Sequence, residues 1–161
     1  MNFEALLEHI KGCLGGEAIL SIDENCTPGA IVLAPEKLLE HMEVLHADEQ
    51  LYFDQLSCVT GIDNGPETGT MEVIYQLYSI AYNHHVTVKV QLNRDQPLVP
   101  SLTPIWKTAD WHEREAYDLL GIHFENHPDL RRILLPADWE GHPLRKDYQH
   151  QEYYRGVKVA Y

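Results

Sequence analysis

The sequence is poor in the residues that build disulfide frameworks, metal clusters and membrane spans. Only three cysteines occur in 161 residues, and Cys13, Cys26 and Cys58 do not have the spacing of metal ligands. We therefore expect reduced, partly buried thiols rather than a disulfide framework or an iron–sulfur cluster. No run of about 18 apolar residues is present, so no segment is expected to span a bilayer. The acidic, amphipathic start MNFEALLEHIKG is unlike a signal peptide, so we expect a cytoplasmic chain.

Positive charge is also scarce, and it is unevenly placed. The chain has 12 Lys and Arg against 25 Asp and Glu, for a formal net charge of −13. Residues 1–100 hold 4 cations and 15 acids, whereas residues 101–161 hold 8 cations and 10 acids. Nucleic-acid binding is disfavoured, because it needs a net basic face. Local binding of acidic groups by the last third of the chain remains possible.

Motifs of catalysis are missing as well. There is no glycine-rich phosphate loop, no G-x-S-x-G and no C-x-x-C. The run that begins at His112 starts like H-E-x-x-H, but position 116 is Ala, so the zinc-protease pattern fails. Glu113 and Glu115 could in principle act as acid and base, although an exposed, salt-bridged helix face is the simpler interpretation. A looser metal site is conceivable from His112, His123, Glu125 and His127. We expect no bound metal and no catalytic residue.

What is present is the composition of one globular domain, with 44% hydrophobic and 23% charged residues. Hydrophobic periodicity predicts helices over residues 2–14 and 35–46. Alternation of apolar and polar residues predicts strands over 18–22, 30–34, 51–61, 71–80 and 85–92. The order αββαβββ predicts an α+β fold of two layers, an antiparallel sheet with two helices on one face.

The chain is expected to divide into four parts. Residues 1–94 form the sheet domain, 95–103 a proline-rich connector, 104–121 a third helix, and 122–161 an extended partner-binding segment and tail. Thr103 could cap the third helix and Pro104 could begin it. On that helix Asp110, Arg114 and Asp118 are four residues apart, which predicts a ladder of ion pairs on the exposed surface.

The stretch HPDLRRILLPADWEGHPLRKDY, residues 127–148, is here called the basic segment. It holds four cations, Arg131, Arg132, Arg145 and Lys146, and six apolar residues without helical or strand periodicity. Paired arginines favour recognition of carboxylates, which need not come from the same chain. Apolar residues without a periodic position in the core must be covered by something. The basic segment is therefore predicted to lie over a partner protein.

Residues 111–148, WHEREAYDLLGIHFENHPDLRRILLPADWEGHPLRKDY, resemble the signature region of the C subunit of the NADH:quinone oxidoreductase family, respiratory complex I. The resemblance implies a structural and assembly subunit of the hydrophilic arm, without an active site or cofactor of its own. It implies packing against the large quinone-site subunit (the D subunit), near the ferredoxin-like iron–sulfur subunit and other subunits of the complex. FMN, iron–sulfur clusters and quinone would belong to those partners. The chain would lie peripherally on the cytoplasmic side of the inner (cell) membrane, as part of a membrane complex.

The resemblance also implies which residues meet the partners. Gln149 stands where the family commonly has proline, so the path of residues 149–161 is not predicted. The residues expected at the partner interface are Glu113, Arg114, Glu115, Asp118, His127, Pro128, Asp129, Arg131, Arg132, Leu134, Trp139, His142, Pro143, Leu144, Arg145, Lys146, Asp147 and Tyr148.

Two alternatives stay open. The first is the equivalent subunit of a membrane-bound hydrogenase or of a ferredoxin-linked complex. The second is a small anion-binding enzyme or module that places Arg131, Arg132 and Arg145 around a phosphate, although no nucleotide loop accompanies them.

Overall fold

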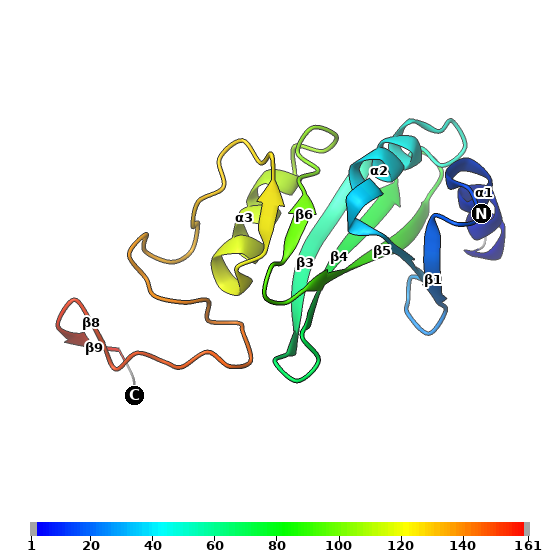
Figure 1. The fold of residues 1–161 in the computed structure, drawn as a ribbon. Helices are drawn as coiled ribbons and strands as arrows, with labels where there is room; N and C mark the ends of the chain where they lie inside the picture. Colours follow the sequence, from blue (N-terminus) through cyan, green and yellow to red (C-terminus); the bar gives the residue numbers. More distant parts are fainter. Residues whose placement is uncertain (1–2, 160–161) are drawn as a thin grey trace.

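A computed structural model describes residues 3–159, which form a five-stranded sheet, three α-helices and two small strand pairs (Figure 1). The elements in chain order are α1 Phe3–Leu14, β1 Ile19–Asp23, β2 Ala30–Leu33, the 3-10 helix η1 Pro35–Lys37, α2 Leu38–Ala47, β3 Gln55–Gly65, β4 Thr70–Ser79, β5 His84–Asn93, β6 Leu98–Pro100, α3 Ala109–Leu120, β7 His123–Glu125, β8 Tyr153–Tyr154 and β9 Val157–Lys158. The predicted α+β class and the predicted order of its first seven elements are confirmed.

The sheet has one buried and one half-exposed face, because its strands alternate apolar and polar residues. In β4 the buried side chains are Met71, Val73, Tyr75 and Leu77, and the residues between them are only half-buried. Helices α1 and α2 cover the buried face with one apolar side each. Their buried residues in the shared core are Leu6, Leu7, Ile10, Leu38, Met42 and Leu45. The predicted two-layer arrangement is therefore confirmed.

The strand order is β1-β2-β5-β4-β3, and three of the four neighbouring pairs are antiparallel as predicted. The exception is β2 with β5, a parallel pair in which Ala30 lies opposite Thr87 and Leu33 opposite Val90. The alternation within a strand shows which face is buried but not which way the strand runs. Strand direction follows from the route of the chain, because α2 carries it from β2 to the far edge before β3, β4 and β5 return.

The third helix begins at Ala109, so the prediction that Thr103 caps it and Pro104 starts it is wrong. Residues 103–108 form turns instead. Long-range hydrogen bonds explain the difference: the Trp106 indole donates to the Phe53 carbonyl (3.1 Å), and the Thr108 hydroxyl donates to the Leu56 carbonyl (3.1 Å). These contacts with the start of β3 compete with helical bonding.

The expected connector and the expected extended tail each contain strands. Strand β6 lies within 95–103 and pairs in parallel with β7, with Val99 opposite Phe124, and both of these side chains are buried. Strands β8 and β9 form a small hairpin near the C-terminus. Within residues 3–159, none of the helices has the length and apolar character that crossing a bilayer requires.

The basic segment follows β7 and has no regular secondary structure. Figure 1 shows it running past the end of α3, on the opposite side of the molecule from α1, and then out to the β8–β9 hairpin. It is therefore displayed at one end of the fold.

Candidate partner interface

Helix α3 supports the basic segment, and its close packing on β3 depends on Gly61. A Cβ atom at that position would collide with Leu120 Cδ1 and would lie 2.7 Å from Ile122 Cδ1. A larger residue at position 61 would therefore force these two buried side chains to shift. The helix then ends at Gly121, whose φ of 76° lies in the left-handed region that glycine adopts readily.

Asp118 on α3 connects the helix to the basic segment. Its carboxylate is fully buried, and Oδ2 accepts the backbone N–H groups of Ile133 (3.0 Å), Leu134 (2.7 Å) and Leu135 (2.9 Å). Oδ1 accepts a hydrogen bond from Arg132 Nη1 (2.8 Å). Burial alone would raise the pKa of Asp118, but these hydrogen bonds lower it below its ordinary value. Asp118 is therefore an ionised, internally satisfied carboxylate.

Arg132 is a structural cation of this chain. Besides Asp118, its guanidinium donates to the Asp118 carbonyl (3.1 Å), to the Trp139 carbonyl (3.0 Å) and to the Gly141 carbonyl (2.9 Å). Only 15% of its side chain is exposed. The guanidinium thus holds two distant parts of the basic segment against the end of α3.

The last carbonyl groups of α3, which a helix leaves without intrahelical donors, are bound by the basic segment. His142 Nδ1 lies 2.9 Å from the Asp118 carbonyl, the Leu144 backbone N–H donates to Leu119 (2.9 Å), and Arg145 Nε donates to Leu120 (2.7 Å). Positive charge at this end is also favoured by the helix dipole. Arg145 is therefore a helix-capping residue.

A second ion cluster joins the end of the basic segment to the sheet. Arg94 at the end of β5 makes two hydrogen bonds with the buried Asp63 of β3 (2.8 and 3.0 Å) and one with Asp147 (2.5 Å). The Lys146 backbone N–H donates to Asp63 (2.8 Å). Hydrogen bonds from Arg94 hold the pKa of Asp63 well below its usual range, despite its burial. The segment is thus tied to the sheet as well as to α3.

Glu113 occupies a different environment on α3. Its carboxylate is fully buried and accepts hydrogen bonds from the Ser101 hydroxyl (2.6 Å) and the Leu102 backbone N–H (2.7 Å). The buried His127 ring lies 3.9 Å away and is 3.1 Å from the Asp110 carbonyl. Burial raises the pKa of Glu113 to about 7, and the nearby Asp110 carboxylate adds to this effect. Glu113 should therefore change its protonation state near neutral pH.

We expect this carboxyl group to make stability depend on pH. Its pKa is about 7 in the folded chain against an ordinary 4.5, so the folded state binds the proton more tightly. The stability that it contributes is complete below about pH 4.5 and is lost as the pH rises through about 7, with a total of about 3 kcal/mol at most. Urea unfolding at a series of pH values across this window measures the effect.

The matched variants are Glu113→Gln and Glu115→Gln. The first should flatten the pH dependence, because a glutamine can still accept from Leu102 but carries no titrating proton. The second changes an exposed carboxylate of the same helix and should leave the dependence as in the wild type. Asp63 and Asp118 have lowered pKa values and titrate below this window. Equal slopes in the wild type and Glu113→Gln would refute the assignment.

The structure sorts the predicted interface residues into three groups. The first group has fully buried side chains, which cannot touch a partner directly: Glu113, Asp118 and His127. Half-buried side chains belong to Arg114, Arg132, Trp139, His142, Pro143, Arg145 and Tyr148. Exposed residues are Glu115, Pro128, Asp129, Arg131, Leu134, Leu144, Lys146 and Asp147.

Two surface predictions on α3 are corrected by this result. Asp110, Arg114 and Asp118 do not form an exposed ladder, because Asp118 is buried and Arg114 donates to the carbonyl groups of Arg131 (3.2 Å) and Arg132 (3.3 Å). Glu113 does not lie on a solvated face. The sequence spacing correctly placed these residues on one helix, but it could not show that the basic segment returns to cover that helix.

Many polar and apolar groups of the basic segment have hydrogen-bond or packing partners within the chain. Trp139 Nε1 donates to the Tyr148 hydroxyl (3.1 Å), and Leu130 packs against the hydrophobic core. Two of its cations have partners within the chain, since Arg132 pairs with Asp118 and Arg145 donates to the Leu120 carbonyl. The expected contact of the segment with a partner protein stays a prediction. Arg131 is different: its side chain is 72% exposed, and its ion-pair partner among residues 3–159 is the exposed Asp129 (3.0 Å). Arg131, Leu134 (62% exposed) and Leu144 (58% exposed) are here called the outer face of the segment.

The alternative ligand sites are not assembled as the sequence suggested. Arg132 and Arg145 bind carbonyl groups of α3, and Arg131 pairs with Asp129, so each of the three guanidinium groups has a partner within the chain. His127 is buried against Asp110, while His123 and Glu125 are exposed. The three cysteines are free and half-buried, as predicted.

A group that sequence reasoning missed is His9, Cys13 and Asp48. The spacing of His9 and Cys13 on one helix was a usable signal. Asp48 lies too far along the sequence to be joined to them without the fold.

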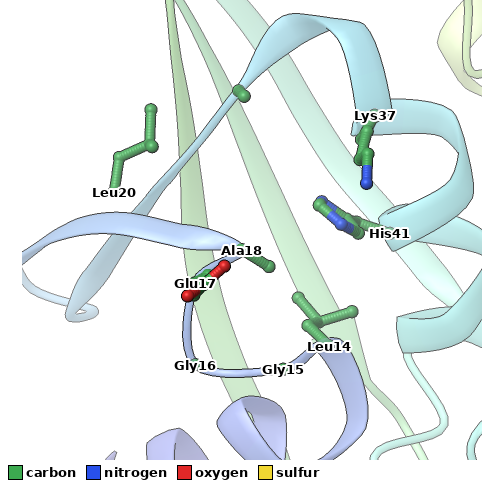
Figure 2. A pocket seen from close by; sticks show the side chains of 9 residues that line it. Leu14, Gly15, Gly16, Glu17, Ala18, Leu20, Lys37 and His41 are labelled. Atoms are coloured by element: carbon green, nitrogen blue, oxygen red, sulfur yellow. The ribbon is translucent and has the colours of Figure 1, made fainter.

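A pocket of about 480 Å³ lies between the end of α1 and α2 (Figure 2). Glu17 lines one side, and Lys37 of η1 and His41 of α2 line the other. His41 Nδ1 is buried and has no hydrogen-bond partner among residues 3–159, and burial lowers the pKa of this imidazole. The pocket combines opposite charges at the far end of the molecule from the basic segment, so it is not part of the candidate interface.

Comparison with known proteins gives consistent results. The sequence model of the family described as "Respiratory-chain NADH dehydrogenase, 30 Kd subunit" matches residues 31–154. A protein of Chloroherpeton thalassium, named as the C subunit of NADH-quinone oxidoreductase, is 46% identical over 154 residues, which cover 91% of this chain but only 61% of that protein. A protein of the same name from Chlorobium phaeobacteroides is 44% identical over 148 residues, which cover 91% of this chain and 89% of the relative.

Two solved structures are also similar. One is titled Nqo5 of the trypsin-resistant fragment (1-134), with a TM-score of 0.65, 29% identity, and coverage of 81% of this chain and all of the other. The second comes from the membrane-bound sulfane sulfur reductase, an archaeal respiratory membrane complex, with a TM-score of 0.73 and coverage of 91% of this chain and 85% of the other. At 20% identity the second likeness shows a shared fold.

Proposed function

Because this chain belongs to the family of the 30-kDa subunit of respiratory-chain NADH dehydrogenase, we propose that it is a non-catalytic subunit of the hydrophilic arm of an NADH:quinone oxidoreductase. The complex as a whole would transfer electrons from NADH to quinone and pump ions. The chain would be peripheral, on the cytoplasmic side of the membrane. The observation that carries the proposal is the family match over residues 31–154, which includes strands β3, β4 and β5, helix α3 and the whole basic segment.

The outer face of the basic segment supports docking against the large quinone-site subunit. Asp118 binds the backbone of Ile133, Leu134 and Leu135, so the exposed Leu134 side chain is presented on a fixed backbone. A preorganised apolar contact loses little conformational entropy on association. Arg131, three residues before Leu134 in the sequence, has a guanidinium that can exchange its exposed Asp129 partner for a carboxylate of another chain.

We further propose that the chain carries no flavin and no iron–sulfur cluster, so that it acts in assembly rather than in electron transfer. Its three thiols have separate neighbours: Cys13 contacts Asp48, Cys26 contacts Asp23 and Lys89, and Cys58 contacts Thr60. Thiols dispersed in this way do not support a cluster, which needs several cysteine ligands around one centre. FMN, the iron–sulfur clusters and quinone would then be held by partner subunits.

Purification of the tagged chain in mild detergent from its native membranes tests the proposal. We expect the quinone-site subunit and the ferredoxin-like iron–sulfur subunit to copurify, and we expect the preparation to contain FMN and to reduce quinone with NADH. Recovery in an assembly with hydrogenase subunits, or in one that accepts electrons from ferredoxin but not NADH, would favour the alternative complexes. The chain recovered alone under conditions that preserve the respiratory complex would contradict membership in any such assembly.

A further inference from the structure

A cluster of three potential metal ligands lies where α1 meets the end of α2. His9 and Cys13 are four residues apart on α1, so they share one helix face. Asp48 directly follows α2. His9 Nε2 lies 3.0 Å from Asp48 Oδ1, and Cys13 Sγ lies 3.4 Å from Asp48 Oδ2. One ligand atom from each residue can be chosen so that all lie within 4.8 Å of one another.

The carboxylate of this cluster is held in place by its own backbone. Asp48 Oδ1 accepts the N–H groups of Gln50 and Leu51, both at 2.9 Å. These bonds fix the orientation of the carboxylate, as hydrogen bonds around metal ligands commonly do. The side chains of His9 and Asp48 are 28% and 24% exposed, so an ion could enter from solvent and keep a water ligand.

The simpler interpretation is a set of hydrogen bonds that joins two helices. The donor types and their spacing favour an ion as well. Imidazole, thiolate and carboxylate are the usual zinc ligands, with bond lengths of about 2.0–2.3 Å. Around a tetrahedral ion, neighbouring donors are then about 3.3–3.8 Å apart. The contact between Cys13 Sγ and Asp48 Oδ2, 3.4 Å, lies within this range, and one ligand atom of each residue lies within 4.8 Å of the others, so side-chain rotations would make room for the ion.

We propose that His9, Cys13 and Asp48 form a binding site for a zinc-class divalent ion, with water as the fourth ligand. Binding forms bonds from the ion to His9 Nε2, Cys13 Sγ and Asp48 Oδ2, and the thiol releases its proton to solvent. Thiolate and imidazole select zinc or cobalt over magnesium and calcium. Zinc has no redox chemistry, so the site joins α1 to α2 and does not conduct electrons. This inference replaces the sequence-based expectation of a metal-free chain, because the fold brings Asp48 to the two α1 residues.

Cobalt titration of the full, metal-stripped chain tests the site. We expect one equivalent of Co²⁺ to produce a thiolate-to-cobalt charge-transfer band and the visible absorption of a four-coordinate ion, both abolished when Zn²⁺ displaces it. Cys13→Ser should remove the charge-transfer band, and His9→Gln should weaken Zn²⁺ binding about tenfold or more. Cys58→Ser changes a half-buried thiol outside the cluster and should bind Co²⁺ as the wild type does.

Thermal unfolding separates metal binding from folding. Zn²⁺ should raise the melting temperature of the wild type and of Cys58→Ser, but not that of Cys13→Ser, whose hydroxyl can still donate to Asp48 in the metal-free fold. A wild-type chain without a charge-transfer band, or a Cys13→Ser chain that binds Co²⁺ with the same spectrum and affinity, would overturn the proposal. Neither result would bear on assembly with the respiratory subunits.

Discussion

Replacement of Asp118 by Ala is expected to lower the free energy of unfolding by about 3–5 kcal/mol. The substitution removes the acceptor of three consecutive backbone N–H groups, those of Ile133, Leu134 and Leu135. It also leaves the largely buried Arg132 guanidinium without its carboxylate. Urea unfolding of the isolated chain gives the loss, and hydrogen exchange should show faster exchange at the amides of residues 133–135.

Two further variants give the scale of this effect. Asp118→Asn keeps one carbonyl oxygen as an acceptor and should fall between the wild type and Asp118→Ala. Asp129→Ala removes an exposed carboxylate from the Arg131 ion pair and should cost about 0–1 kcal/mol. An Asp118→Ala chain that is as stable as Asp129→Ala, with unchanged exchange at residues 133–135, would show that Asp118 does not hold the basic segment.

Charge reversal should separate Arg131 from Arg145. Arg131→Glu is expected to leave the melting temperature of the isolated chain unchanged, because the ion pair of Arg131 with Asp129 is exposed. In the assembled complex it should weaken docking by about 2–5 kcal/mol, because a like charge would face partner carboxylates in a partly desolvated interface. Arg145→Glu should lower the melting temperature of the isolated chain, since it places negative charge at the C-terminal end of α3, where Arg145 now binds the Leu120 carbonyl.

The comparison needs thermal unfolding of the free chain and the amount of intact complex in membranes. Glu43→Arg, a charge reversal at an exposed residue of α2, controls for a general effect of surface charge away from the predicted interface residues. Arg131→Glu with wild-type assembly and full NADH:quinone activity would remove the interface role proposed for Arg131. Leu134→Asp provides an independent check of the same face, and normal assembly of that variant would remove the docking proposal for the whole outer face.

The sequence by itself determined the local elements and the buried face of the sheet. In the strand that contains Met71, Val73, Tyr75 and Leu77, apolar and polar residues alternate. This pattern predicts one buried and one solvent-facing side of the strand without information from the rest of the chain. Helical spacing likewise located α1 and α2. The resemblance of residues 111–148 to a known signature was confirmed by the family match over residues 31–154. These are properties of contiguous residues, so they can be read from a single sequence.

Tertiary structure decided what each charged residue of that signature does. The same spacing that predicts an exposed ladder on α3 places Asp118 on a face that the basic segment returns to cover, and this makes it a buried carboxylate. The intrachain contacts of Arg132 and Arg145 arise because the basic segment packs on α3. The start of α3 at Ala109 is also set by tertiary contacts, because hydrogen bonds to Phe53 and Leu56 outweigh the local helix signals. Asp48 joins His9 and Cys13 only because α1 and α2 pack together. The burial and the ion pairing of a side chain depend on contacts between segments that are distant in the sequence. Local sequence patterns do not show which distant segment will pack against a given helix face.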